Sequence, residues 1–360
     1  MQIGIVGLPY SGKSTLYQTI TKTLLDPSEL AKSEAHQAII KVPDERLDRL
    51  TEIFNPKKNV NATIDVVDVV GLQKGDSGST QFTGNFLSKV KTNDALVQVV
   101  RLFENEAVPH SEGSINMMRD IESFETEFIL SDMALIEKRI ESVKKQVQKT
   151  QDDKLKHELP ILEKCFEILQ EERPLRDHPF AKEDLAILKT YQLLSIKPML
   201  IALNLDETQV KDAEKYLNEL VKKKLGHNTK ALVFFGQIEL EMSELSDGDA
   251  EIFMKDYGIK ESALDSLIRG AYDLLGLQSF FTVGEDECRA WTIKKGMNAQ
   301  EAAGEIHTDF FKKFIRAEVV GYEDFIEYGS FAKAKDAGKW RLEGKEYIVQ
   351  DGDIISVRHS

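Results

Sequence analysis

Five short apolar segments recur along the first two thirds of the chain, each about as long as a β-strand. They cover residues 3–7, 64–70, 95–100, 199–203 and 231–235, and they are rich in Val, Ile, Leu or Phe. Continuous apolar runs of this length are typical of parallel strands that are buried on both faces. The pattern therefore predicts an α/β domain built on a parallel sheet.

Between the third and fourth apolar segments the spacing changes to that of a helix. Residues 115–159 contain neither Gly nor Pro, and apolar residues recur three or four positions apart from Ile121 to Val147. Pro160 then opens a second apolar stretch, which Pro174 interrupts. The first helix would exceed about 25 residues, more than an ordinary globular helix needs. We therefore expect an antiparallel helical hairpin inserted into the α/β domain.

The pattern of apolar residues and glycines changes once more after residue 277. Segments 280–283, 290–293 and 354–357 have the composition of strands, glycines separate them, and residues 299–314 have the spacing of one amphipathic helix. This predicts a small α+β module. The resulting boundaries assign residues 1–102 and 196–276 to the α/β domain, 103–195 to the helical insertion and 277–360 to the C-terminal module.

Composition and charge narrow the class of protein. Hydrophobic residues make up 41% and charged residues 30% of the 360 positions, which is typical of a soluble globular chain. The net charge of −14 disfavours a surface that wraps nucleic acid throughout. Two cysteines, Cys165 and Cys288, are too few for a disulfide framework. No apolar run approaches a membrane span and the first residues lack a signal sequence, so we expect a cytoplasmic protein.

The turn after the first apolar segment matches the phosphate-loop pattern in full. Gly7 permits a tight turn, and Gly12 lets backbone N–H groups approach a phosphate at the start of a helix, where the dipole favours an anion. Lys13 would reach the β- and γ-phosphates, and the Ser14 hydroxyl would bind Mg²⁺. The predicted phosphate-binding residues are Gly7, Leu8, Pro9, Tyr10, Ser11, Gly12, Lys13, Ser14 and Thr15.

A second acidic element follows the 64–70 segment. Asp68 ends this strand three residues before Gly71, which fits the metal-side element of phosphate-loop proteins. Asp68 would hold Mg²⁺ together with Ser14, and the Gly71 N–H would sense the γ-phosphate. Asp65 is the competing carboxylate, but it lies six residues from Gly71.

The residues after the fourth strand bear on the choice of base. Guanine-specific members of this class carry Asn-Lys-x-Asp there, whereas this chain has Asn204, then Leu205 in place of the lysine, and Glu207 at the aspartate position. A longer glutamate does not keep the paired contact to guanine, whose loss leaves buried donors unpaired. We expect Asn204, Leu205 and Glu207 to contact the base, and ATP to bind, with GTP left open. The alternative is that Asn204 caps a helix.

These motifs resemble those of the YchF/Obg-like ATPase family. The likeness extends over nearly the whole chain and includes the phosphate loop, residues 42–47, 68–72, 99–101, 204–207, 289–293, 303–310, 314–318 and 351–353. The resemblance implies a phosphate-loop nucleoside triphosphatase domain with an inserted coiled-coil hairpin, followed by a TGS domain, which is a ubiquitin-like β-grasp module. It also implies association with ribosomes.

Several positions depart from the family pattern. Tyr10 and Ser11 replace the usual Asn-Val of the loop, and the shortened segment 34–41 offers no identifiable switch threonine for Mg²⁺. Leu72 stands where Ras-like enzymes have a water-orienting glutamine, as in the family. The family's histidine precedes Val-Val-Arg, where this chain has Gln98. No catalytic residue can be named, and we expect slow hydrolysis that Gln98→His would raise if the position is matched correctly.

Two further features of the sequence are candidate sites. His307 has no second His or Cys at ligand spacing, which favours a surface or interface histidine over a metal ligand. A basic run surrounds Trp340 and could contact phosphates and stack on a base. A solvated loop and edge strand is favoured there, because the C-terminal block is slightly acidic. The run consists of Lys333, Lys335, Lys339, Arg341 and Lys345.

The leading hypothesis is a monomeric, cytoplasmic, nucleotide-dependent switch protein that binds ATP (or GTP) with Mg²⁺ and hydrolyses it slowly. The resemblance implies that it acts on ribosomes or ribosomal RNA through its TGS and helical domains. The alternative is a non-hydrolysing adaptor that senses nucleotide and recruits a partner through the same domains. A small-molecule kinase is disfavoured because the chain carries no lid or acceptor-site signature.

Overall fold

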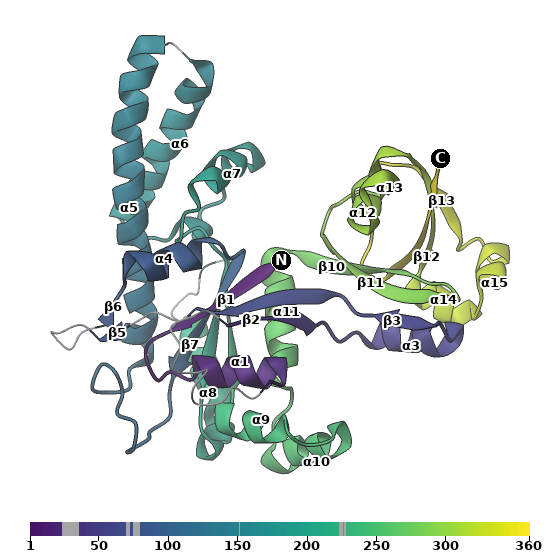
Figure 1. The fold of residues 1–360 in the computed structure, drawn as a ribbon, viewed down its shortest axis with the longest axis horizontal. Helices are drawn as coiled ribbons and strands as arrows, with labels where there is room; N and C mark the ends of the chain where they lie inside the picture. The colour runs from purple at the N-terminus through teal and green to yellow at the C-terminus, as the bar shows by residue number, and fades with distance from the viewer. Residues whose placement is uncertain (24–35, 70–72, 75–79, 151, 223–225, 227) are drawn as a thin grey trace. The chain divides into compact units, whose positions relative to one another are not determined.

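The computed structural model describes residues 1–23, 36–69, 73–74, 80–150, 152–222, 226 and 228–360. Contacts within the chain divide it into two compact units. Figure 1 shows the helices and strands of both. The first unit contains residues 1–38 and 65–274, and the second contains residues 39–64 and 275–360.

The first sheet confirms the α/β prediction. Its strand order is β2-β4-β1-β7-β8-β9, and β1 pairs in parallel with both β4 and β7, as do β7 with β8 and β8 with β9. The five predicted apolar segments supply five of these strands. The bounds are β1 Gln2–Gly7, β2 His36–Lys41, β4 Thr63–Asp68, β7 Ala95–Arg101, β8 Met199–Asn204 and β9 Thr229–Phe234.

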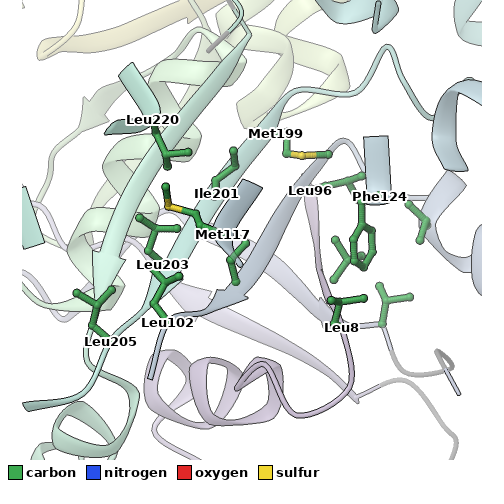
Figure 2. Packing of buried hydrophobic residues seen from close by; sticks show 14 of the residues in the cluster. Leu8, Leu96, Leu102, Met117, Phe124, Met199, Ile201, Leu203, Leu205 and Leu220 are labelled. Atoms are coloured by element: carbon green, nitrogen blue, oxygen red, sulfur yellow. The ribbon is translucent and has the colours of Figure 1, made fainter. Parts of the chain in front are cut away.

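Helices cover this sheet and close its core. Every residue of β7 and β8 is buried, as expected for central strands with helices on both faces. Figure 2 shows Leu96, Ile201 and Leu203 from these strands within one apolar cluster that also holds Phe124 and Leu220 from helices. The helices are α1 Lys13–Thr21, α4 Gly84–Lys91, α8 Ala213–Lys222, α9 Gly236–Met242, α10 Asp247–Tyr257 and α11 Ala263–Leu275.

The predicted helical hairpin is present, and Figure 1 shows α5 and α6 side by side. Helix α5 spans Met117–Thr150 and α6 spans Asp153–Gln170. The expectation that Pro160 opens the second helix was wrong, because Asp152 caps α6 by accepting a hydrogen bond from the Lys154 N–H. Pro160 lies inside α6. Among the described residues, no helix has the length and apolar character needed to span a membrane.

The hairpin has an apolar core of its own. Ile136 and Val143 of α5 are fully buried against Leu162 and Cys165 of α6. The chain returns to the first sheet through η1 Leu175–Asp177, α7 Lys182–Leu188 and η2 Lys189–Tyr191, whose apolar residues join the same cluster.

The second unit is the predicted α+β module with an added segment. Its sheet has the order β13-β12-β14-β10-β11-β3, and the apolar core beneath it includes Phe280, Ile293 and Val319. The strands are β10 Leu277–Thr282, β11 Glu287–Lys294, β12 Phe314–Gly321, β13 Arg341–Glu343, β14 Asp353–His359 and β3 Lys58–Val60, and the helices are α3 Glu45–Phe54, α12 Ala299–Ile306, α13 Thr308–Lys312, α14 Tyr322–Tyr328 and α15 Phe331–Asp336.

Residues 39–64 lie in this second unit, whereas the sequence-based boundaries placed them in the α/β domain. Strand β3 pairs in parallel with β11, which extends the C-terminal sheet. Arg46 donates to the Asp351 carboxylate at 2.9 Å, and the Phe54 ring stacks on Phe325 with centroids 5.4 Å apart. Contacts between residues so distant in sequence leave no periodic pattern from which they could be predicted.

The single helix predicted over residues 299–314 is interrupted at His307. Its extended backbone ends α12, and its Nδ1 accepts a hydrogen bond from the Asp309 N–H, which caps α13. The chain then enters β12 at Phe314. His307 is therefore a capping residue, a local role that side-chain periodicity does not reveal.

Candidate nucleotide-binding site

The phosphate loop lies where the sequence predicts it, between β1 and α1. Gly12 occupies the N-cap of α1 with φ of +97°, a conformation that favours glycine. The Lys13 ammonium folds back over the loop and donates to the Leu8 carbonyl at 3.0 Å. The Leu8 side chain itself lies in the apolar cluster (Figure 2), so this residue contributes its backbone to the loop.

Ser14 and Asp68 meet beneath the loop, as the two motifs predict. The Ser14 hydroxyl donates to Asp68 Oδ2 at 3.1 Å, and Asp68 is fully buried. The other carboxylate oxygen, Oδ1, has no hydrogen-bond partner within the described residues. A hydroxyl and a carboxylate with an unused oxygen are hard ligands that suit Mg²⁺, which binds few protein groups and keeps phosphate and water ligands. The residues present therefore fit this ion.

Burial opposes the charges of Lys13 and Asp68, and each partly stabilises the other. Burial lowers the pKa of Lys13, while the nearby Asp68 carboxylate raises it. Burial likewise raises the pKa of Asp68, and Lys13 together with the Ser14 hydroxyl counteracts this shift. Two charges held in a poorly solvated site interact strongly with phosphate groups and a cation. The electrostatics therefore favour an anionic ligand accompanied by a metal ion.

Gly7 and Gly12 lie so close to other groups of the protein that a side chain at either position would collide with them. A Cβ at Gly7 would lie 2.6 Å from the Val99 carbonyl oxygen, and one at Gly12 would lie 2.1 Å from Asn204 Nδ2. Gly236, at the start of α9, also approaches Asn204, whose Oδ1 would be 2.9 Å from a Cβ there. The Thr15 side chain lies beside the same glycine. These contacts explain why both ends of the loop require glycine.

Asn204 connects the base-side elements to the phosphate loop. Its Nδ2 donates to the Ser11 carbonyl and its Oδ1 accepts from the Gly236 N–H, each at 3.1 Å, and the side chain is buried. Asn204 does not cap the helix that follows it, because Asp206 caps η3 (Glu207–Asp212) by accepting from the Thr208 N–H. The Oδ1 of Asn204 instead accepts from the first N–H of α9. Asn204 fixes the loop, and its amide atoms are already engaged.

The other two predicted base contacts lie elsewhere. Leu205 is buried and belongs to the apolar cluster, as Figure 2 shows, so its side chain packs in the core and does not offer itself to a base. Glu207 is the first residue of η3 and is exposed. The structure therefore brings only Asn204 of the three to the phosphate loop.

Gln98 lies on β7, but its side chain is committed to helix α5. The Nε2 atom donates to the Asp120 carbonyl at 2.9 Å, and the residue is buried. This contact does not support the expectation that Gln98 stands at a catalytic position. Gly71 and Leu72 lie outside the described residues, as do residues 34–35 and 75–79 of the two expected switch segments.

Tyr10 has an unusual conformation for a large side chain. Its φ is +63° and the residue is 62% exposed. A left-handed conformation costs a residue with a Cβ about 1 kcal/mol, and asparagine tolerates it better than tyrosine. The family's asparagine at this place therefore has a physical reason, and Tyr10 holds the loop under local strain.

Two buried acidic groups of the first unit carried no recognisable signal in the sequence. Glu239 accepts hydrogen bonds from the Phe235 and Ala263 N–H groups, which fixes the turn that precedes α9, and burial raises its pKa to about 7. Asp120 pairs with His110, with Nε2 and Oδ2 3.1 Å apart, at the start of α5. Both are isolated residues in helical segments, and only tertiary contacts distinguish them.

The sheet, the phosphate loop and the Ser14–Asp68 pair define a P-loop nucleotide-binding protein. A family model described as a 50S ribosome-binding GTPase matches residues 2–164, and the model YchF-GTPase_C, described as a protein of unknown function, matches residues 277–360. The chain is 43% identical to the ribosome-binding ATPase YchF of Bacillus subtilis, over 99% of this chain and 98% of that protein. The chain belongs to the YchF family.

More distant relatives agree with this assignment. Obg-like ATPase 1 of Gallus gallus is 37% identical over 99% of this chain and 91% of its own length. The solved structure of the Schizosaccharomyces pombe YchF GTPase superposes with a TM-score of 0.87 at 33% identity, covering 99% of this chain and 97% of that one. The family resemblance and the fold class inferred from the sequence are thereby confirmed.

Proposed function

We propose that the protein is a cytoplasmic ATP-dependent switch protein that hydrolyses ATP slowly and acts on ribosomes. The observation that carries the proposal is the convergence of Lys13, Ser14 and Asp68 at the start of α1, with one Asp68 oxygen unused. Helix N-termini and buried lysines bind phosphates, and this arrangement suits a triphosphate.

The base side supports ATP over GTP. Leu205 is packed in the core and Glu207 is exposed at the start of η3. A guanine-reading carboxylate has to be held in the pocket and accept two hydrogen bonds, and neither residue is held that way. Two of the relatives are named ATPases, which agrees with this preference.

Magnesium would be held by Ser14 and Asp68 and would neutralise charge on the phosphates. Lys13 binds the phosphates, and the loop between Gly7 and Gly12 presents backbone N–H groups to them. The Nε2 atom of Gln98 is engaged with α5, and a neutral amide does not take a proton from water at pH 7. Hydrolysis would then be slow, at about 10⁻⁴ s⁻¹ as in unassisted members of the wider class.

Ribosome association is proposed from the relatives. The Bacillus subtilis protein is named a ribosome-binding ATPase, and one family model that matches this chain is described as a 50S ribosome-binding GTPase. The helical hairpin and the C-terminal unit are the proposed contact regions, because the nucleotide elements lie outside both of them.

Competition of ATP and GTP for the purified protein tests the base preference. Calorimetric titration in the presence of Mg²⁺ should show ATP binding at least as tightly as GTP. The same titration of Glu207→Ala should leave the ATP affinity within about twofold, since an exposed side chain contributes little. A clear preference for GTP would contradict the proposal.

A non-hydrolysing adaptor is the second candidate, and the commitment of Gln98 to α5 favours it. Single-turnover hydrolysis with and without ribosomes separates the two functions. A switch enzyme should release phosphate, and ribosomes should accelerate it. An adaptor should bind ATP and ribosomes while phosphate release stays at the background rate in both cases.

A further inference from the structure

Strand β9 is the last strand of the first sheet. Among the described residues it pairs with β8 alone, so no described strand covers its outer edge. The Met199 N–H donates to the Asn228 carbonyl and the Leu205 N–H to the Phe234 carbonyl. Backbone groups alternate in direction along a strand, so even-numbered residues of β9 face β8 and odd-numbered residues face outward.

Both ends of this outward row are satisfied, but its centre is not. The Thr229 N–H donates to the Gly226 carbonyl, and the Phe235 N–H donates to Glu239. For Ala231 and Val233, no partner of the outward N–H and C=O groups is found in the described part of the chain. Ala231 and Val233 are alternate residues of the strand, and their free backbone groups are the donors and acceptors that an added strand would use.

A cleft of about 750 Å³ runs along this edge. Its walls carry apolar side chains, with charged ones at the rim. Leu232, Phe235 and Ile259 are buried, and the other apolar side chains that line the cleft are at least partly exposed. Tyr257 remains 37% exposed. A parallel edge strand next to an apolar cleft is the geometry in which extended peptides bind by strand addition. The cleft is lined by Val210 of η3 and Leu217 of α8, by Tyr257 at the end of α10 and Ile259 after it, and by Ala231 and Val233 of the edge strand.

Charges at the rim favour an acidic ligand. Lys260 pairs with Glu214 across the rim at 2.8 Å, and Arg269 pairs with Glu261, which neutralises four of the rim charges. Lys211 and Lys255 then remain against Asp256 alone, which leaves a positive excess on a chain whose net charge is −14. Exposed ion pairs contribute little, so the Lys260–Glu214 contact does not close the cleft.

We propose that this cleft binds an extended, acidic peptide segment of a partner protein, which adds as a strand to Ala231 and Val233. Main-chain hydrogen bonds to these two residues set the position of the peptide, and its alternate side chains contact the apolar walls. Acidic residues at the ends of the segment face Lys211 and Lys255. The site uses none of the phosphate-loop residues and goes beyond the proposed nucleotide-dependent function.

Proline substitution on the edge strand separates strand addition from other modes of binding. In Ala231→Pro the outward N–H is lost while the ladder to β8 is kept, a position at which edge strands tolerate proline. A phage-displayed library of random peptides of about twelve residues is selected on the full-length protein. We expect enrichment of alternating β-branched sequences flanked by Asp or Glu. Fluorescence anisotropy should show at least about fivefold weaker binding to Ala231→Pro.

A second pair of variants covers the case in which the proline variant folds poorly. Leu217→Glu places a charge on the cleft wall, whereas Val221→Glu places it one turn further along α8, where the side chain is 66% exposed and outside the cleft. The first should weaken peptide binding at least about tenfold and the second should leave it within twofold. ATP binding should be unchanged in both.

Hydrogen exchange tests the edge without any ligand. The Ala231 and Val233 amides should exchange rapidly in the free protein and slow at least tenfold when a selected peptide is added, while the Leu232 amide is protected throughout. Slow exchange at both residues in the free monomer would overturn the proposal. So would peptides that bind Ala231→Pro unchanged, a selection that yields no acidic extended sequence, or sedimentation showing a dimer that Ala231→Pro dissociates.

Discussion

The phosphate end and the base end of the nucleotide site are built in different ways. At the phosphate end, the loop holds its shape through glycines and places Lys13, Ser14 and Asp68 in one buried group. At the base end, Asn204 is engaged with the loop itself, Leu205 packs in the core and Glu207 is exposed.

This difference separates affinity from selectivity. Charges and backbone donors at the phosphate end act on any nucleoside triphosphate, because the phosphates are common to all of them. Discrimination between bases requires polar groups held for one base alone, and the base-end side chains serve packing and loop positioning instead. The site should therefore bind triphosphates firmly and choose among bases weakly.

The largest effect is expected from removing the loop lysine. Lys13→Ala should weaken ATP binding about a thousandfold, or about 4 kcal/mol, because charge-assisted bonds to two phosphates are lost. The fold should persist, since Lys13 donates its hydrogen bond to a loop carbonyl, although Asp68 loses a charge partner. Calorimetry measures the affinity and circular dichroism the melting temperature. Lys41→Ala, at an exposed position of β2, is the matched control. Unchanged ATP affinity in Lys13→Ala would contradict the assignment of this loop as the phosphate-binding loop.

The next largest effect should follow from cutting the connection between the two ends. Asn204→Ala leaves the Ser11 carbonyl and the Gly236 N–H without their partner and should lower the free energy of unfolding by about 3 kcal/mol. ATP and GTP affinities should fall by the same factor, because Asn204 acts through the loop.

Urea denaturation and paired titrations check both parts of this expectation. Asn61→Ala removes a single, longer hydrogen bond to the Val42 carbonyl. It should lower the free energy of unfolding by less than about 1 kcal/mol, roughly a third of the effect of Asn204→Ala. A selective loss of one nucleotide in Asn204→Ala would show that Asn204 reads the base directly, and the comparison between the two ends would fail.

Glu239, which fixes the turn before α9, should make the stability of the fold depend on pH. Burial raises the pKa of Glu239 to about 7, so its carboxyl is protonated in the folded state over a range in which the unfolded chain is ionised. Protonated Glu239 stabilises the fold fully at a pH below its pKa in the unfolded chain. This stabilisation is lost as the pH rises through its pKa in the folded protein. The unfolding free energy should decrease by about 2 kcal/mol from pH 5 to pH 7 on this account.

Urea denaturation across this pH range measures the contribution of Glu239. In Glu239→Gln the side chain does not titrate, so this part of the pH dependence should vanish, although the amide is a poorer partner for two backbone donors. An identical pH profile for the variant and the parent would mean that another group titrates. Lys13→Ala should keep the part of the dependence that Glu239 contributes, because Lys13 is not among the groups that shift the pKa of Glu239.

The smallest effect concerns strain in the phosphate loop. Tyr10→Asn should raise the unfolding free energy by about 0.5–1 kcal/mol, because asparagine adopts a positive φ at lower cost. Tyr10→Ala keeps the Cβ and should give no such gain. Thermal denaturation distinguishes the two. Equal stabilities of the two variants would show that the backbone at residue 10 is not strained by its side chain.

The sequence predicted the parts of the molecule that repeat a local pattern. Apolar runs indicated five of the six strands of the first sheet, helical spacing indicated the hairpin, and the two motifs brought Ser14 together with Asp68. These features depend on neighbouring residues or on a spacing that backbone geometry enforces.

What the sequence missed depends on contacts between distant segments. The placement of residues 39–64 in the second unit rests on pairs such as Arg46 with Asp351. The engagement of Gln98 with α5, and of Asn204 with Ser11, likewise joins segments far apart along the chain. His307 interrupts a helix through a capping contact that competes with regular spacing.

The two-part composition of the second unit has a consequence for the order of events during synthesis. Leu47 and Leu50 of α3 are fully buried in a unit whose other part begins at Leu275. The ribosome makes that second part roughly 10 to 40 seconds after the first, for about 210 residues at about 5–20 residues per second. During that interval the apolar face of α3 lacks the residues against which it packs in the finished protein. A chain truncated before Leu275 would keep this face exposed permanently, so only a full-length chain should bury it.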